Sequence, residues 1–132
     1  MRGATFDTGV LVALDRNERE AWVVLRWLVN RRGVPTVPTV VTAQAWRDAR
    51  SQERLARVLA ECRPEALSDE LARKAGELCR RSGTADIVDA VVIESAGRRS
   101  DDVYTGDTDD LEHLAGHITK PVAIIPIGGL PQ

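Results

Sequence analysis

Aspartate residues at three places along the chain offer the clearest chemistry in this sequence. Asp7 follows the apolar run ATF, Asp86 and Asp89 lie in the apolar stretch ADIVDAVVI, and Asp107 and Asp110 follow DVYT. Carboxylates that converge repel one another unless a hard divalent cation neutralises them, and ligand sets made only of oxygen favour Mg²⁺ or Mn²⁺. The three groups therefore indicate a Mg²⁺ or Mn²⁺ site, provided that the fold brings them together.

Each aspartate also has a structural explanation. Asp7 can cap the helix expected after it, and Asp86 can interact favourably with the dipole at a helix start. Asp107 and Asp110 fall in the first turn of another expected helix, where acidic residues are common. Asp89 lies a full turn inside an apolar helix, so a buried arginine partner is its main structural alternative.

The elements that must position these residues follow from the hydrophobic pattern. Short apolar runs alternate with helical periodicity, which predicts a three-layer α/β/α sandwich with a mainly parallel central sheet. Strands are expected at 4–7, 34–41, 62–67, 102–106 and 121–127, and helices at 10–14, 18–31, 39–46, 52–60, 68–81, 85–99 and 107–116. In such a sheet, the strands that precede Asp7 and Asp107 end at the edge where ligands bind.

Composition sets broader limits. A chain of 132 residues with 43% hydrophobic and 29% charged residues is expected to form a single domain over 1–132. The net charge of −2 predicts no global basic field, and no apolar run reaches the ~20 residues of a membrane span. The N-terminus lacks the pattern of a secretory signal, so a cytoplasmic location is expected, with Cys62 and Cys79 as free, partly buried thiols.

Several segments together resemble the PIN domain, specifically the VapC-type ribonuclease toxins of bacterial toxin–antitoxin pairs. The segments are FDTGVLVAL, VPTVVTAQAWR, GTADIVDAVVIESA and VYTGDTDDLEHLA, followed by the strand VAIIPI. The resemblance covers nearly the whole chain and implies an α/β/α sandwich. It also implies a Mg²⁺-dependent endoribonuclease that acts on RNA, is neutralised by a small antitoxin protein and forms a homodimer.

The resemblance also implies roles for individual residues. The catalytic acids of the family fall on Asp7, Asp89 and Asp107, and Asp86 and Asp110 are accessory acids for the metal on the same surface. The second family acid, usually a glutamate, falls on a fourth catalytic position, Gln44. An amide can hydrogen-bond a metal-bound water or coordinate weakly, but it adds no charge to balance Mg²⁺.

Arginines near Gln44 are candidates for holding RNA phosphates. Arg47 lies one helical turn from Gln44, and Arg50, Arg54 and Arg57 follow at spacings that place most of them on one side of a single helix. The alternative is a solvated helix face. Trp22, Trp27 and Trp46 are candidates either for a partner surface or for the core, and a core role is expected for at least two of them.

Three other functions are compatible with parts of the pattern. A PIN fold that binds RNA or an antitoxin without cleaving remains open, because Gln44 interrupts the set of acids. A receiver-like signalling domain also binds Mg²⁺ with clustered acids, but it needs a lone phosphoacceptor aspartate after the middle strand. A haloacid-dehalogenase-type phosphatase needs Asp-x-Asp after the first strand, where Gly9 replaces the second aspartate.

Overall fold

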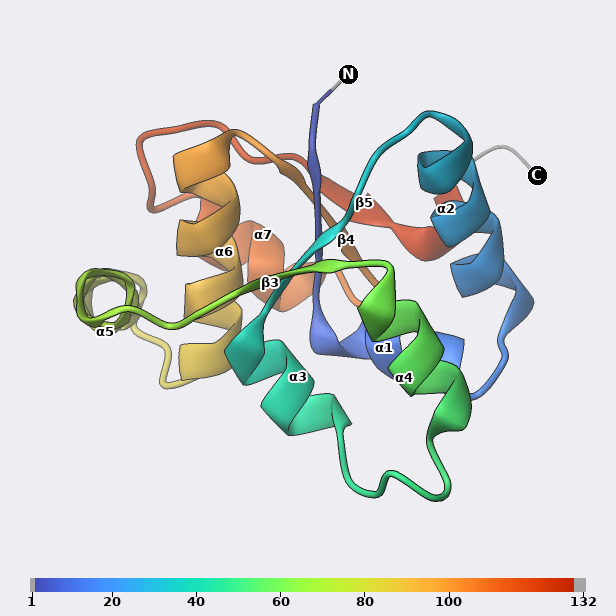
Figure 1. Ribbon diagram of the computed structural model, residues 1–132. Helices are drawn as coiled ribbons and strands as arrows, with labels where there is room; N and C mark the ends of the chain where they lie inside the picture. The colour runs from blue at the N-terminus through green and yellow to red at the C-terminus, as the bar shows by residue number, and fades with distance from the viewer. Residues whose placement is uncertain (1, 130–132) are drawn as a thin grey trace.

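A five-stranded, all-parallel sheet lies between two layers of helices in the computed structural model, which describes residues 2–129 (Figure 1). The strand order is β3-β2-β1-β4-β5. The strands are β1 (Ala4–Phe6), β2 (Thr36–Pro38), β3 (Arg63–Glu65), β4 (Asp102–Thr105) and β5 (Ile124–Pro126). This arrangement confirms the predicted α/β/α sandwich.

The helices divide between the two sides of the sheet. In Figure 1, α1, α2 and α4 lie to the right, and α5, α6 and α7 lie to the left. The helices are α1 (Thr8–Asp15), α2 (Arg19–Asn30), α3 (Thr39–Ala45), α4 (Glu53–Ala60), α5 (Asp69–Ser82), α6 (Ile87–Arg99) and α7 (Asp109–Ala115), with the 3₁₀ turn η1 (Ile127–Gly129). Most helix bounds agree with the sequence pattern to within two residues.

Local sequence signals explain where α5 begins and ends. The side chain of Ser68 accepts a hydrogen bond from the backbone N–H of Leu71 at 3.0 Å, which caps the helix start. Gly83 ends the helix at φ 74°, a left-handed conformation that glycine adopts without the steric cost of a Cβ.

The core explains why α6 is apolar on most sides. This helix packs against β1, β2 and β4 and contacts α5 and α7. Val91, Val92 and Ile93 are therefore buried together in one cluster with Phe6 of β1 and Leu14 of α1. A carboxylate on the first turn of such a helix is held rigidly beside the sheet.

An ion-pair network fixes the other end of α6. The Nε of Arg99 lies 2.9 Å from Oδ2 of Asp101, its Nη2 donates to the Thr5 hydroxyl at 2.8 Å, and its Nη1 pairs with Glu65. Only 7% of the Asp101 side chain is exposed. The network joins the C-terminal end of α6 to β1 and β3.

The arginine-rich region differs from its prediction. Arg47 and Arg50 lie in the connection between α3 and α4, so they do not share one helix with Arg54. The reason is Gln52, whose side-chain oxygen accepts hydrogen bonds from the backbone N–H groups of Arg47 and Asp48. Because these N–H groups bond to Gln52 and not to helical carbonyl oxygens, the segment between α3 and α4 is not helical. The prediction that Arg47 and Arg50 share one helix face with Arg54 is therefore wrong.

The structure also bears on the cysteines, the tryptophans and the predicted absence of a membrane span. Cys62 and Cys79 are free thiols, buried and half-buried respectively, as predicted. Trp22, Trp27 and Trp46 all pack against the core while remaining partly exposed. No helix within residues 2–129 is both long and apolar enough to cross a membrane.

Candidate active site

Asp7 lies where β1 ends and α1 begins. It both caps α1 and places a carboxylate at the edge of the sheet, the two roles that the sequence suggests. Its Oδ1 accepts a hydrogen bond from the backbone N–H of Val10 at 3.1 Å and so caps α1. Its Oδ2 accepts a hydrogen bond from the hydroxyl of Thr105, the last residue of the neighbouring strand β4. Only 8% of Asp7 is exposed. Burial raises the pKa of Asp7 and the charge of Asp107 adds to this rise, while the hydrogen bonds from Thr105 and the backbone lower it.

Asp107 lies beside Asp7, and Thr105 connects the two residues. The Thr105 hydroxyl donates to Asp7 and accepts from the backbone N–H of Asp107 at 3.0 Å. The carboxylate of Asp107 is exposed, and its Oδ1 accepts from the backbone N–H of Asp109 at 3.2 Å. The ends of β1 and β4 therefore present one buried and one exposed carboxylate at the same edge of the sheet.

Asp86 and Asp89 approach this edge from the start of α6. Asp86 is the N-cap residue, and its Oδ1 accepts from the backbone N–H of Asp89 at 3.0 Å. Burial raises the pKa of the half-buried Asp89 to about 7, with further contributions from the charges of Asp86, Asp7 and Asp110. No ion pair joins Asp89 to a lysine or arginine in the described part of the chain. The environment of Asp89 is one of like charges, and the arginine partner considered above is not found.

Gln44 reaches the same region from α3. The hydroxyl of Thr8, the residue after Asp7, donates a hydrogen bond to Oε1 of Gln44. The Gln44 side chain is exposed, so its amide group lies at the rim of the site. Gln44 is thus close to Asp7 in the fold although the two residues lie far apart in the sequence.

The oxygen atoms gathered here fit a hard cation in type and charge. No cluster of three or more His, Cys, Asp and Glu side chains among residues 2–129 has the geometry to hold a metal ion by itself. Mg²⁺ commonly keeps several waters and is bound through one or two carboxylates together with substrate phosphates. Two carboxylate pairs, Asp7 with Asp107 and Asp86 with Asp89, match this mode of binding in their chemistry.

The candidate RNA-binding arginines are not gathered around the acids. The Arg47 guanidinium donates to the carbonyl oxygens of Ala43 at 3.1 Å and Trp46 at 2.7 Å, so it folds back onto its own segment. Arg54 donates to the carbonyl oxygen of Asp15 at 2.7 Å, at the end of α1 opposite Asp7. Since α1 has 8 residues, about 12 Å of helix separates its two ends. Arg50 is exposed in the connection before α4.

Comparison with known proteins identifies the family. Residues 4–117 match the PIN domain family. The chain belongs to the PIN domain family. No curated protein matches the sequence.

Solved structures share the architecture of this PIN domain at low sequence identity. A toxin–antitoxin complex from Klebsiella pneumoniae matches with a TM-score of 0.71 and 19% identity, covering 89% of this chain and 97% of that chain. VapBC2 from Rickettsia felis, bound to a DNA fragment from its promoter, matches with a TM-score of 0.70 and 12% identity, covering 93% and 97%. DNA-bound VapBC from Salmonella typhimurium matches with a TM-score of 0.68 and 16% identity, covering 96% and 99%. At these identities the likeness shows the fold.

Sequence reasoning missed two threonines of this PIN domain site. Thr8 holds Gln44, and Thr105 holds Asp7. Their positions in the sequence could have suggested this role, because each hydroxyl lies next to a site aspartate: Thr8 directly follows Asp7, and Thr105 lies two residues before Asp107.

Proposed function

We propose that this PIN domain is a metal-dependent endoribonuclease and the toxin component of a toxin–antitoxin pair. The supporting observation is the approach of Asp7 and Asp107, linked by Thr105, to Asp86 and Asp89 at one edge of the sheet. The charges of Asp7 and Asp110 both act on Asp89, so the carboxylates form one electrostatic unit. Such a unit suits a hard divalent cation and the phosphodiester that it would bind.

The protein residues would divide the work of hydrolysis among themselves. Asp7, Asp89 and Asp107 would hold Mg²⁺ or Mn²⁺, with Asp86 and Asp110 adding negative charge around them. The bound cation would lower the pKa of the attacking water and offset charge on the phosphate oxygens.

The other polar groups orient these acids. Thr105 fixes the carboxylate of Asp7 by hydrogen bonding, and Thr8 fixes the amide of Gln44. The exposed amide of Gln44 is free to donate a hydrogen bond to a phosphate oxygen.

The proposal includes a protein partner. The similar structure from Klebsiella pneumoniae is a toxin–antitoxin complex, which favours a small antitoxin as the binding partner of this chain. The resemblance to VapC-type toxins extends the proposal to a homodimer as its assembly. A second function is favoured by one observation: Gln44 supplies no charge where the family pattern has an acid. That function is binding of RNA or an antitoxin without cleavage.

Cleavage of a pool of structured cellular RNAs by the purified, partner-free protein distinguishes the endoribonuclease from the non-cleaving binding module. The reactions contain Mg²⁺, Mn²⁺ or EDTA, and the variants are Asp7→Asn, Asp89→Asn and, as a matched control, Asp69→Asn on the exposed first turn of α5. We expect metal-dependent cuts at a few positions that both site variants lose and the control keeps. Folded wild-type protein that cuts no RNA with either metal would overturn the nuclease and favour the non-cleaving module.

A further inference from the structure

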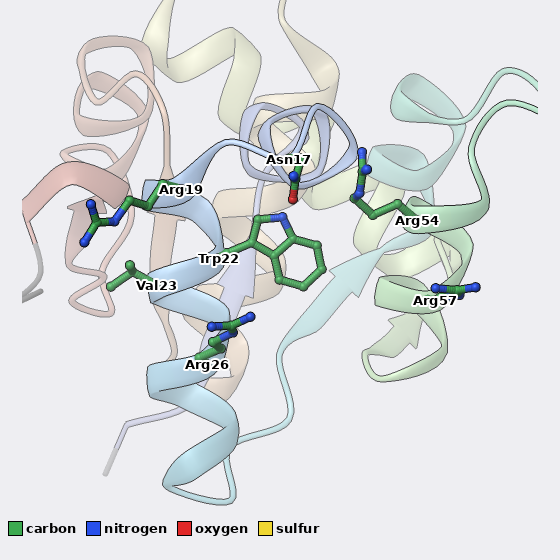
Figure 2. Close-up of a pocket in the computed structure, with 7 residues that line it drawn as sticks. All are labelled: Asn17, Arg19, Trp22, Val23, Arg26, Arg54 and Arg57. Carbon is green, nitrogen blue, oxygen red and sulfur yellow. The ribbon is translucent and has the colours of Figure 1, made fainter.

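A basic groove lies apart from the aspartates. Its volume is about 620 Å³, and it lies between α2, α4 and the turn that contains Asn17. Figure 2 shows the indole of Trp22 between α2 and α4, with Arg26 of α2 and Arg54 of α4 near it. Arg57 lies farther along α4, and Arg19 extends from the opposite side of α2. No acidic residue is among the groove-lining residues that the structure describes.

The negative charges near the groove do not neutralise it. Glu18 and Glu20, which flank Arg19 in the sequence, line a different hollow. Glu53 pairs with Arg57 at 2.6 Å and offsets part of its charge, whereas Arg19, Arg26 and Arg54 form no ion pair among residues 2–129. The groove therefore keeps a positive field directed at whatever enters it.

Trp22 gives the groove an aromatic surface. Its Nε1 is buried and has no hydrogen-bond partner among residues 2–129, so the nitrogen edge of the indole faces the protein. The part of the ring that lines the groove is consequently apolar. A flat apolar ring with guanidinium groups nearby suits a planar base together with the phosphates that flank it.

We propose that this groove is a binding site for single-stranded RNA, in which Arg26 and Arg57 contact phosphates and Trp22 stacks on a base. The proposal rests on the proposed function, which makes RNA the substrate. An acidic peptide would satisfy the charges but would leave the indole face without a planar partner, so RNA fits the groove more completely.

The groove lies close enough to the aspartates for one RNA strand to reach both. Arg54 and Gln52 both bond to Asp15 at the end of α1, and the other end of α1 begins beside Asp7. The helix between them is about 12 Å long, which at about 3.4 Å per stacked nucleotide corresponds to three or four nucleotides. RNA held in the groove would therefore extend to the aspartates within a few nucleotides.

The test is binding of a fluorescein-labelled 12-nucleotide oligoadenylate, followed by fluorescence anisotropy in EDTA over a series of KCl concentrations. The groove variant is Arg26→Gln with Arg57→Gln, and its matched control is Arg73→Gln with Arg80→Gln on α5, on the other side of the sheet (Figure 1). Each lost phosphate contact lowers the slope of log K against log salt by about 0.7. We expect the groove variant to lose about 1.4 from the magnitude of the slope and the control to keep the wild-type slope.

Trp22 is tested separately. Trp22→Phe keeps an aromatic ring and should keep affinity, whereas Trp22→Leu should weaken oligoadenylate binding about fivefold or more. Circular dichroism checks that both variants are folded. Equal affinity of the two folded variants would overturn the stacking role, and the arginine slopes stand as an independent readout should Trp22→Leu fail to fold.

Other outcomes are equally decisive. A wild-type slope in the groove variant, an equal loss in the α5 control, or no binding by the wild type would each overturn the proposal. So would a groove variant that loses affinity only for a labelled ten-residue oligoglutamate, because the groove would then take acidic peptides. Binding in EDTA requires no cleavage, so absence of RNA cleavage with the expected slopes would overturn the nuclease and leave the groove standing.

Discussion

Replacing Asp89 by asparagine should stabilise the metal-free protein while removing its proposed activity. The pKa of Asp89 rises from its ordinary value of 3.8 to about 7, because the carboxylate is half-buried among like charges. At about 1.4 kcal/mol per pH unit, the gap of about 3 units corresponds to a ceiling of about 4 kcal/mol. Asp89 is partly solvent-exposed and salt screens its neighbours, so we expect a gain of about 1 to 2 kcal/mol at pH 8.

The sign of the pH dependence follows from proton binding. Between about pH 4 and pH 7 the folded protein holds a proton on Asp89 that the unfolded chain has released, so stability falls as pH rises through this range. The destabilising effect of the Asp89 charge is complete above pH 7 and absent below pH 4. The advantage of Asp89→Asn should therefore be largest at pH 8 and vanish near pH 4.

Urea unfolding in EDTA, followed by circular dichroism at pH 4, 6 and 8, measures this effect. Asp69→Asn is the matched control, because it removes the same charge from an exposed helix start where Asp69 pairs with Arg73 at 2.9 Å. The control should lose up to about 1 kcal/mol instead of gaining stability. A destabilised Asp89→Asn at pH 8, or an equal gain at pH 4, would refute the reasoning that like charges surround Asp89.

Three further predictions concern the same framework. Mg²⁺ at ten times its Kd should stabilise the wild type by about 1.4 kcal/mol and Asp89→Asn by clearly less, as urea unfolding would show; equal gains would remove Asp89 from the metal site. Gln44→Glu should lower the Mg²⁺ concentration needed for half-maximal RNA cleavage, with Gln44→Ala as its control, and a higher requirement would place residue 44 away from the metal. Arg99→Met should cost about 2 to 4 kcal/mol in urea unfolding, because it leaves Asp101 and Glu65 without their cation, and a loss below about 1 kcal/mol would contradict that network.

The positions of the aspartates follow from local sequence. Asp7 directly follows β1 and Asp107 comes two residues after the end of β4. Because parallel strands end at one edge of a sheet, the proximity of these aspartates could be inferred without coordinates. Asp89 stands out because its helix neighbours are apolar on nearly every side, which requires burial next to the sheet.

Side-chain contacts between distant segments could not be inferred in this way. The bond from Thr105 to Asp7 depends on the register that places Phe6 beside Tyr104, and register is a tertiary property. The break between α3 and α4 depends on Gln52, a residue whose polar side chain gave no sign that it would be buried and bonded to the backbone. Trp22 joins a groove with Arg54 only because α2 and α4 are neighbours in the fold.

The aspartates and the basic groove stand on different parts of the molecule. The acids extend from strand ends and from α6, which the core and the Arg99 network hold in place, while the groove lies on exposed positions of α2 and α4. Under the proposal that the groove binds RNA, a substitution there would alter which RNA is retained without displacing a carboxylate. RNA preference would then evolve on α2 and α4 while the proposed chemistry at the sheet edge stays constant.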